Sequence, residues 1–70
     1  MDTSIGDKFQ LRERPRFLKT SDNVPMLRPP DLVGAEEVGV VVALHPLNTV
    51  SIRFRRGTFL IPIEQLIPYD

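Results

Sequence analysis

Few residues of this chain are able to carry catalytic chemistry. General acid–base catalysis needs titratable side chains that converge in a pocket. His45 is the single histidine, and the proline that follows it predicts an exposed turn rather than a base or a metal ligand. On a strand, the adjacent carboxylates Glu36 and Glu37 would point to opposite faces, so they could not act as a pair. The chain has no cysteine and no Gly-rich phosphate loop. We therefore expect no enzyme activity, no catalytic residue, no cofactor and no metal site.

Two groups of residues instead predict a protein-binding surface. In the proline-rich stretch 25–31, Met26 and Leu27 are held beside rigid prolines, and a stiff apolar segment loses little entropy when it docks. On the outer face of a predicted hairpin, Leu60 lies among arginines, which is typical of an interface hot spot. Alternatively, Met26 and Leu27 cap the end of a barrel and Leu60 is an ordinary exposed leucine. The predicted partner-binding residues are Met26, Leu27, Arg28, Pro29, Pro30, Arg53, Arg55, Arg56 and Leu60.

These residues depend on a central hairpin that we expect over residues 49–63. Apolar and polar residues alternate before Gly57, and the apolar set resumes after it, as in two half-buried strands. Gly57 can supply the positive φ that the turn needs. The predicted pairs are 54 with 59, 52 with 61 and 50 with 63. The inward residues would be Val50, Ile52, Phe54, Phe59, Ile61 and Ile63, and the solvent-facing ones Ser51, Arg53 and Arg55.

A first strand and a long connection precede this hairpin. Lys8–Arg12 alternates, with Phe9 and Leu11 inward. Prolines interrupt residues 13–34, which we therefore expect to form one long loop, extended over residues 28–31. Loops of this length tend to be functional or disordered. The apolar loop residues expected to pack on the body are Phe17, Leu18, Val24, Met26, Leu27 and Leu32.

The remaining elements complete a small barrel. A second strand over residues 37–44 would put Val38, Val40, Val42 and Leu44 on one face, with Gly39 marking a bend or a close backbone approach. Residues 45–48 form a turn, residues 64–66 a 3₁₀ turn, and residues 67–69 a final edge strand beside the first. The fold class is all-β, in a single domain over residues 1–70. We expect an SH3-like five-stranded barrel with a long Pro-rich loop after its first strand.

Composition limits the partners and the location. No run approaches the ~20 apolar residues that span a bilayer, and the N-terminus does not resemble a targeting peptide, so we expect a cytoplasmic protein without membrane insertion. Basic residues crowd residues 8–28 and the hairpin tip, but the net charge is zero, which argues against nucleic acid and fits a solvated surface. The alternatives to a regulatory protein-binding module are an SH3-like nucleic-acid-binding module and a small structural subunit of a photosynthetic complex.

Three motifs together resemble one family. They are the string PMLRPPD over residues 25–31, the pair Glu36-Glu37 followed by Gly39, and the hairpin pattern over residues 50–60. From about Ile5 to Leu66 the chain resembles the SipA-like proteins, small cyanobacterial regulators that interact with the sensor histidine kinase NblS. The resemblance implies an SH3-like regulator that binds the ATP-binding region of that kinase and stimulates its autophosphorylation in high-light and stress signalling.

Overall fold

The elements of the chain are strands joined by loops and two short 3₁₀ helices. The computed structural model describes residues 3–13, 15–22, 26–34 and 36–69, and within these ranges it contains no α-helix, which confirms the all-β class. The strands are β1 (Lys8–Leu11), β2 (Leu18–Thr20), β3 (Leu27–Arg28), β4 (Gly39–His45), β5 (Thr49–Phe54), β6 (Gly57–Pro62) and β7 (Leu66–Pro68). The 3₁₀ helices are η1 (Pro30–Leu32) and η2 (Ile63–Gln65).

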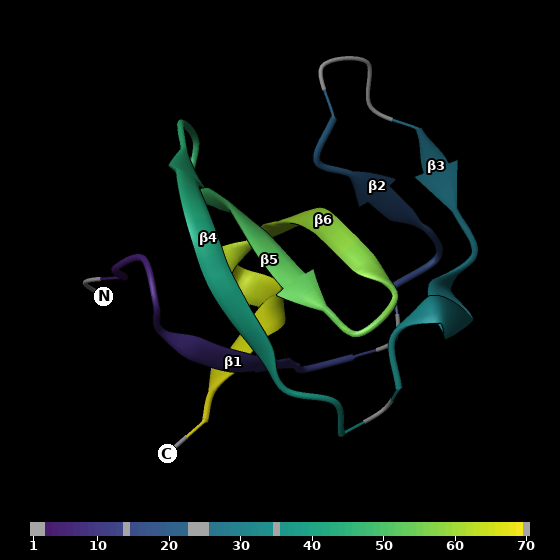
Figure 1. Cartoon of the computed structure of the whole chain (residues 1–70), viewed down its shortest axis with the longest axis horizontal. Coiled ribbons are helices and arrows are strands. Elements are labelled where there is room, and N and C mark those ends of the chain that lie inside the picture. Colours follow the sequence, from purple (N-terminus) through teal and green to yellow (C-terminus); the bar gives the residue numbers. More distant parts are fainter. Residues whose placement is uncertain (1–2, 14, 23–25, 35, 70) are drawn as a thin grey trace.

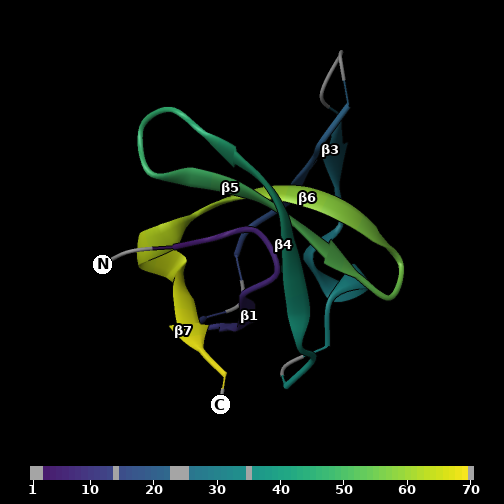
Figure 2. The same cartoon turned by 60° about the vertical axis from the view of Figure 1, so that its left-hand side comes forward.

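The strands form one antiparallel sheet in the order β3-β2-β6-β5-β4-β1-β7. The prediction of five strands is wrong, because β2 and β3 lie inside the segment 13–34 that was expected to be one loop. Prolines disfavour a long α-helix there, but they flank β2 rather than occupy it. In both views the β2–β3 hairpin projects from the body (Figures 1 and 2). No pairing joins β3 to β7 in the described part of the chain, so a closed barrel is not observed.

The central hairpin has the predicted faces but a different register. Phe54 lies opposite Gly57 and Ile52 opposite Phe59, so each partner is two residues earlier than predicted. The turn consists of Arg55 and Arg56, and the positive φ expected at Gly57 is observed, at 154°, in the first residue of β6. A shift of two residues preserves the face of every side chain, because the period of a strand is two. The residues of the inward set that are buried are Val50, Ile52, Phe54, Phe59 and Ile61.

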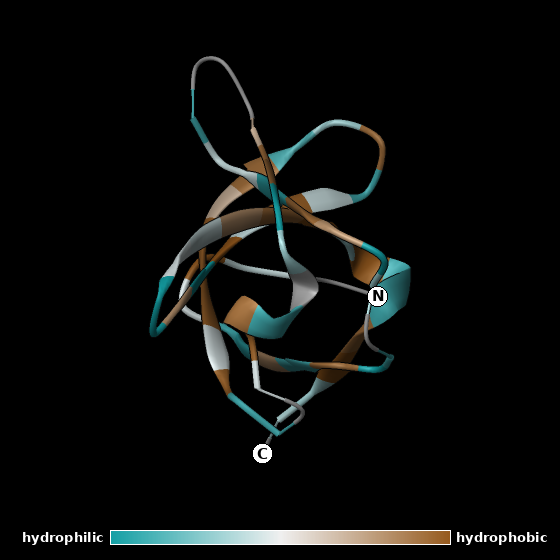
Figure 3. Cartoon of the chain, turned by 90° about the vertical axis from the view of Figure 1, so that its right-hand side faces the viewer, coloured by the Kyte–Doolittle hydropathy of each residue, from teal (hydrophilic) through white to brown (hydrophobic). Residues whose placement is uncertain are grey.

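The core gathers residues from both ends of the chain. The predicted inward residues Phe9 and Leu11 are buried, and Ile63 packs partly buried against the core. Figure 3 shows the hydrophobic residues running along the strands, with hydrophilic residues in several loops. Among the described residues, the buried apolar ones are Phe9, Leu11, Leu18, Val33, Val41, Val50, Ile52, Phe54, Phe59, Ile61 and Leu66.

The apolar residues of the segment 13–34 divide into two groups. Leu18 is only 2% exposed and Leu32 packs partly buried against the core, as expected. The expected packing of Phe17, Met26 and Leu27 is wrong, because all three are more than half exposed. Val24 lies outside the described residues. Leu18 is buried because it belongs to β2, and β2 pairs with β6 beside the core.

The prediction for β4 places the wrong set of alternating side chains on the core face. Val41 is fully buried, whereas Val42 and Leu44 are exposed and Val40 is half-buried. Valines occupy both phases of this run, so their alternation does not select a face. The core face of β4 is instead determined by Gly39. The side chains of Ile52 and Phe54 occupy the space that a Cβ at Gly39 would fill, as expected for a close backbone approach. A bulge between Val41 and Ala43 then changes the register with β5.

Boundaries of the smaller elements also differ from the prediction. β4 begins at Gly39 rather than at residue 37. Of the residues 28–31 that were predicted to be extended, Arg28 lies in β3, whereas Pro30 and Asp31 belong to η1. The fixed φ of Pro30 suits the first turn of a helix, which explains η1. η2 begins one residue earlier than predicted, at Ile63. β7 pairs with β1 at the edge of the sheet and contains Pro68, which confirms the predicted edge position.

Candidate functional site

Two hollows lie along the β2–β6 pair of strands. The first, which we call the Leu60 groove, has a volume of about 780 Å³ and is formed by β2, β6, η2, Thr49 of β5 and the residues 12–13 and 15–17. Its apolar lining includes Leu60, Ile61, Pro62 and Phe17, of which Phe17 is 51% exposed. Leu60 pairs with β2 on one side and with β5 on the other, so its backbone is fixed in the sheet.

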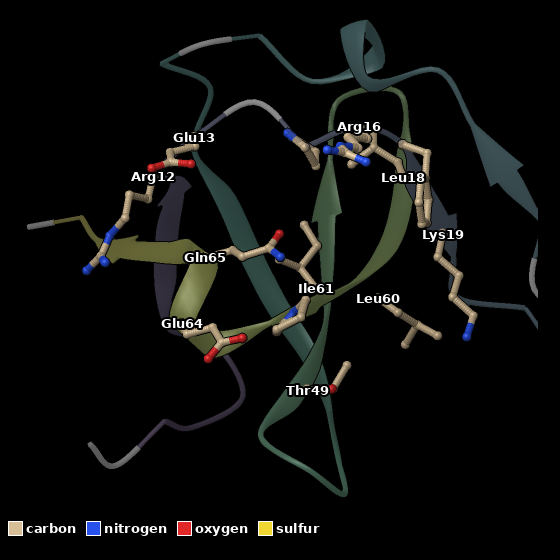
Figure 4. A pocket seen from close by; sticks show the side chains of 13 residues that line it. Arg12, Glu13, Arg16, Leu18, Lys19, Thr49, Leu60, Ile61, Glu64 and Gln65 are labelled. Carbon is tan, nitrogen blue, oxygen red and sulfur yellow. The ribbon is translucent and has the colours of Figure 1, made fainter.

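Charged side chains surround the Leu60 groove. In Figure 4, Arg12, Glu13 and Glu64 lie on one side of the view, and Lys19 lies beside Leu60 on the other. Arg16 also lines the groove, so three cations and two carboxylates are among its described lining residues. Apolar surface inside a charged rim is the composition of a protein interface rather than of a catalytic pocket.

The second hollow, which we call the Ser51 hollow, has a volume of about 620 Å³ and contains three linked polar side chains. Ser51 Oγ lies 2.6 Å from His45 Nε2 and 2.5 Å from Ser21 Oγ. A serine beside a histidine resembles the start of a nucleophilic dyad. Ser51 is only 1% exposed, however, so a substrate cannot reach its hydroxyl. This trio therefore forms a hydrogen-bond chain whose central hydroxyl is buried.

The match to a known family covers most of the chain. The family model described as "Protein CHLORORESPIRATORY REDUCTION 42-like" matches residues 5–66, which is most of the chain. The chain belongs to the CRR42-like family. No curated protein and no solved structure matches it.

Membership of the CRR42-like family corrects the resemblance drawn from the sequence. The SipA-like assignment is wrong, and the stimulation of a sensor histidine kinase that it implied is wrong with it. The string PMLRPPD is short, and alternating strands around a glycine turn occur in many small β-domains. Neither feature is therefore sufficient to assign a family.

The predicted partner-binding residues of this CRR42-like protein are distributed over separate surfaces. Met26, Arg28 and Arg56 line the Ser51 hollow together, whereas Leu60 lines the other groove. Residues from both predicted patches therefore share the Ser51 hollow, and Leu60 is separated from Arg56. The predicted residues that line neither hollow are Leu27, Pro29, Arg53 and Arg55, all of them exposed, and the side chain of Pro30 lies outside the described residues.

Sequence reasoning did not find the Ser51 trio of this CRR42-like protein. Alternation correctly placed Ser51 away from the core, but the prediction that it faces solvent is wrong. His45 is exposed as predicted, although its ring is hydrogen-bonded. Ser21, which follows β2, covers Ser51, and its backbone N–H donates to the carbonyl oxygen of Thr58 at 3.0 Å. Only the pairing of β2 with β6, which no sequence pattern indicated, brings these residues together.

Glu37 joins two segments of this CRR42-like protein. Its Oε2 accepts a hydrogen bond from the backbone N–H of Arg55 at 2.6 Å, and its Oε1 accepts one from that of Gly34 at 3.1 Å. We expect Glu37→Ala to lower the free energy of unfolding by about 1–2 kcal/mol, since two charge-assisted hydrogen bonds are lost near solvent. Urea denaturation measures the change.

The neighbouring residue provides the control for this prediction. Glu36 is exposed, and only its backbone carbonyl accepts a hydrogen bond, from Gln10 Nε2 at 2.7 Å. Glu36→Ala removes the same charge and keeps that bond, so we expect a change within about 0.5 kcal/mol. Equal urea midpoints for the two variants would contradict a bridging role for Glu37.

Neither metal ligation nor membrane crossing is indicated for the described residues. Within them, no group of three or more His, Asp or Glu side chains is placed to hold a metal ion. The helices of the described chain are also too short to cross a membrane.

Proposed function

We propose that this protein is a non-enzymatic binding module that docks onto a larger protein assembly concerned with chlororespiratory reduction. The observation that supports a docking role is the Leu60 groove, which is lined by half-exposed Phe17 and by sheet-anchored Leu60. The family description supplies the process. A subunit docked to a larger assembly was one of the alternatives that the sequence left open.

The groove favours a partner segment with an apolar anchor and nearby carboxylates. Leu60 and Phe17 offer apolar contact area, and Leu60 loses little freedom on binding because β-pairing already fixes its backbone. Lys19 borders Leu60, so a carboxylate of the partner would meet a cation there. Phe17 is the one aromatic residue among those that line the groove, which disfavours a polyproline ligand, since polyproline grooves are lined by several aromatic rings.

We further propose that the sheet is a derivative of an SH3-like barrel. Strands β1, β4, β5, β6 and β7 follow the predicted order, with η2 directly before the last strand. The β2–β3 hairpin then occupies the long connection after the first strand. In this arrangement the added hairpin builds one wall of the Leu60 groove, because β2 contributes Leu18 and Lys19 to it.

Sedimentation of cell extracts tests docking. The wild-type protein should sediment with a large assembly, and Phe17→Asp should reduce the bound fraction at least about tenfold, as expected for an interface anchor. Leu47→Asp provides the matched control, because Leu47 is 94% exposed and lies outside the groove. Circular dichroism of both variants checks that they are folded.

The outcomes of this experiment are distinct. A wild-type protein that sediments only at its own mass would contradict docking. Equal release of the two folded variants would contradict the Leu60 groove as its site. Release of the wild-type protein by nuclease would instead favour the nucleic-acid alternative.

A further inference from the structure

The Ser51 hollow contains polar groups that docking at the Leu60 groove does not use. Ser51 is 1% exposed and is hydrogen-bonded on both sides, to His45 Nε2 at 2.6 Å and to Ser21 Oγ at 2.5 Å. Ser21 is half-buried and His45 is exposed, so both ends of this chain of hydrogen bonds reach the surface of the hollow. Because the buried Ser51 hydroxyl is hydrogen-bonded to both His45 and Ser21, it fixes the positions of these two side chains.

The direction of the hydrogen bonds decides which hydroxyl groups of the hollow can donate to a ligand. When His45 Nε2–H donates to Ser51 Oγ, the Ser51 hydroxyl donates to Ser21 Oγ, and the Ser21 hydroxyl hydrogen is left free. An acceptor bound beside Ser21 would select this direction. Thr20 Oγ1 already accepts the backbone N–H of Met26 at 2.8 Å, so its hydroxyl hydrogen is also available. Two neutral donors can therefore face the hollow.

Positive charge lines the same hollow. Arg28 comes from β3 and Arg56 from the β5–β6 turn, and both are exposed. Asp22 is the single carboxylate among the residues that line it. Guanidinium groups present planar sets of donors that match the oxygens of phosphate. The hollow thus combines two cations with hydroxyl donors, against one acidic group.

We propose that the Ser51 hollow is a binding site for a phosphate group. Arg28 and Arg56 supply the charge, and Ser21, held in place through Ser51 and His45, supplies an oriented neutral donor. A phosphate group has several acceptor oxygens and so engages guanidinium and hydroxyl donors together. The ligand is either free phosphate or a phosphate monoester, since the recognition chemistry is the same for both.

Titration with inorganic phosphate at constant ionic strength tests the site. Amide NMR signals of residues 20–22, 28 and 51 should shift in a saturable way. We expect Arg28→Gln combined with Arg56→Gln to weaken binding at least about tenfold, and Ser21→Ala to weaken it several-fold. Arg53→Gln combined with Arg55→Gln is the matched control: it removes the same charge, and neither residue lines the hollow.

The results distinguish phosphate binding in the Ser51 hollow from non-specific attraction of anions to a basic surface. Retained affinity in the control pair together with the loss at Arg28 and Arg56 supports the proposal. Equal losses in the two pairs, or equal shifts with chloride, would overturn it. A parallel titration with phosphoserine identifies the source: tighter binding of phosphoserine indicates a phosphate carried on a protein, and equal binding indicates free phosphate.

Discussion

Replacement of Gly39 by alanine is expected to lower the free energy of unfolding by about 3 kcal/mol or more, at the upper end for overpacked cores. The added Cβ would overlap Cγ2 of Ile52 and would lie 2.7 Å from Cε1 of Phe54. Both neighbours are buried, with exposed fractions of 0% and 4%, so neither can move aside without displacing the core. For a domain of this size the melting temperature should fall by roughly 12 °C or more.

Gly34 provides the control for this substitution. A Cβ built at Gly34 meets Glu37 atoms no closer than 3.7 Å, which is an ordinary contact. Gly34→Ala also keeps the N–H that donates to the Glu37 carboxylate. We expect its melting temperature to stay within a few degrees of the wild type. Similar melting of the two alanine variants in calorimetry would contradict the close approach at Gly39.

Truncation of Phe59 to alanine is expected to cost about 3–5 kcal/mol, because it removes a large side chain from the core and leaves a cavity. Phe59 is 2% exposed, lies opposite Ile52 and packs with its ring centroid 6.5 Å from that of Phe54. A domain of seventy residues has a total stability of only about 4–10 kcal/mol. The Phe59→Ala substitution should therefore remove a large fraction of this stability, and the midpoint of urea denaturation should fall accordingly.

Tyr69→Ala is the matched aromatic control. Tyr69 is 48% exposed, and its backbone N–H, which donates to the Lys8 carbonyl at 3.0 Å, is unchanged by the substitution. We expect a loss of at most about 1 kcal/mol. A urea midpoint for the Phe59 variant equal to that of the Tyr69 variant would show that the core does not depend on this ring.

The periodicity of the sequence predicts which hairpin residues are inside but not which residues are paired. Val50, Ile52 and Phe54 are separated by two, so any even register places them on the core face. The actual register depends on the length of the turn, which two residues are enough to form here. In β4 the periodicity fails altogether, because valines occupy both phases and the core-facing Gly39 adds no apolar side chain to the phase of Val41.

The candidate sites were less predictable than the core. Both hollows need β2, a strand of three residues in a segment that prolines make irregular. Its inward residue, Leu18, is followed by Lys19 and Thr20, which give too short a pattern to indicate a strand. Contacts such as that between Ser21 and Ser51 join residues thirty positions apart, and local pattern carries no information on them.

The pairing of β1 with β7 has a consequence for synthesis in the cell. Leu11 lies opposite Leu66, so a nascent chain emerging from a ribosome carries one open flank of its first strand until almost all of the domain has been translated. Because pairs so distant along the chain form late and slowly, the unfinished polypeptide offers this flank to neighbouring nascent chains. Chaperone shielding during translation would be most useful in that interval.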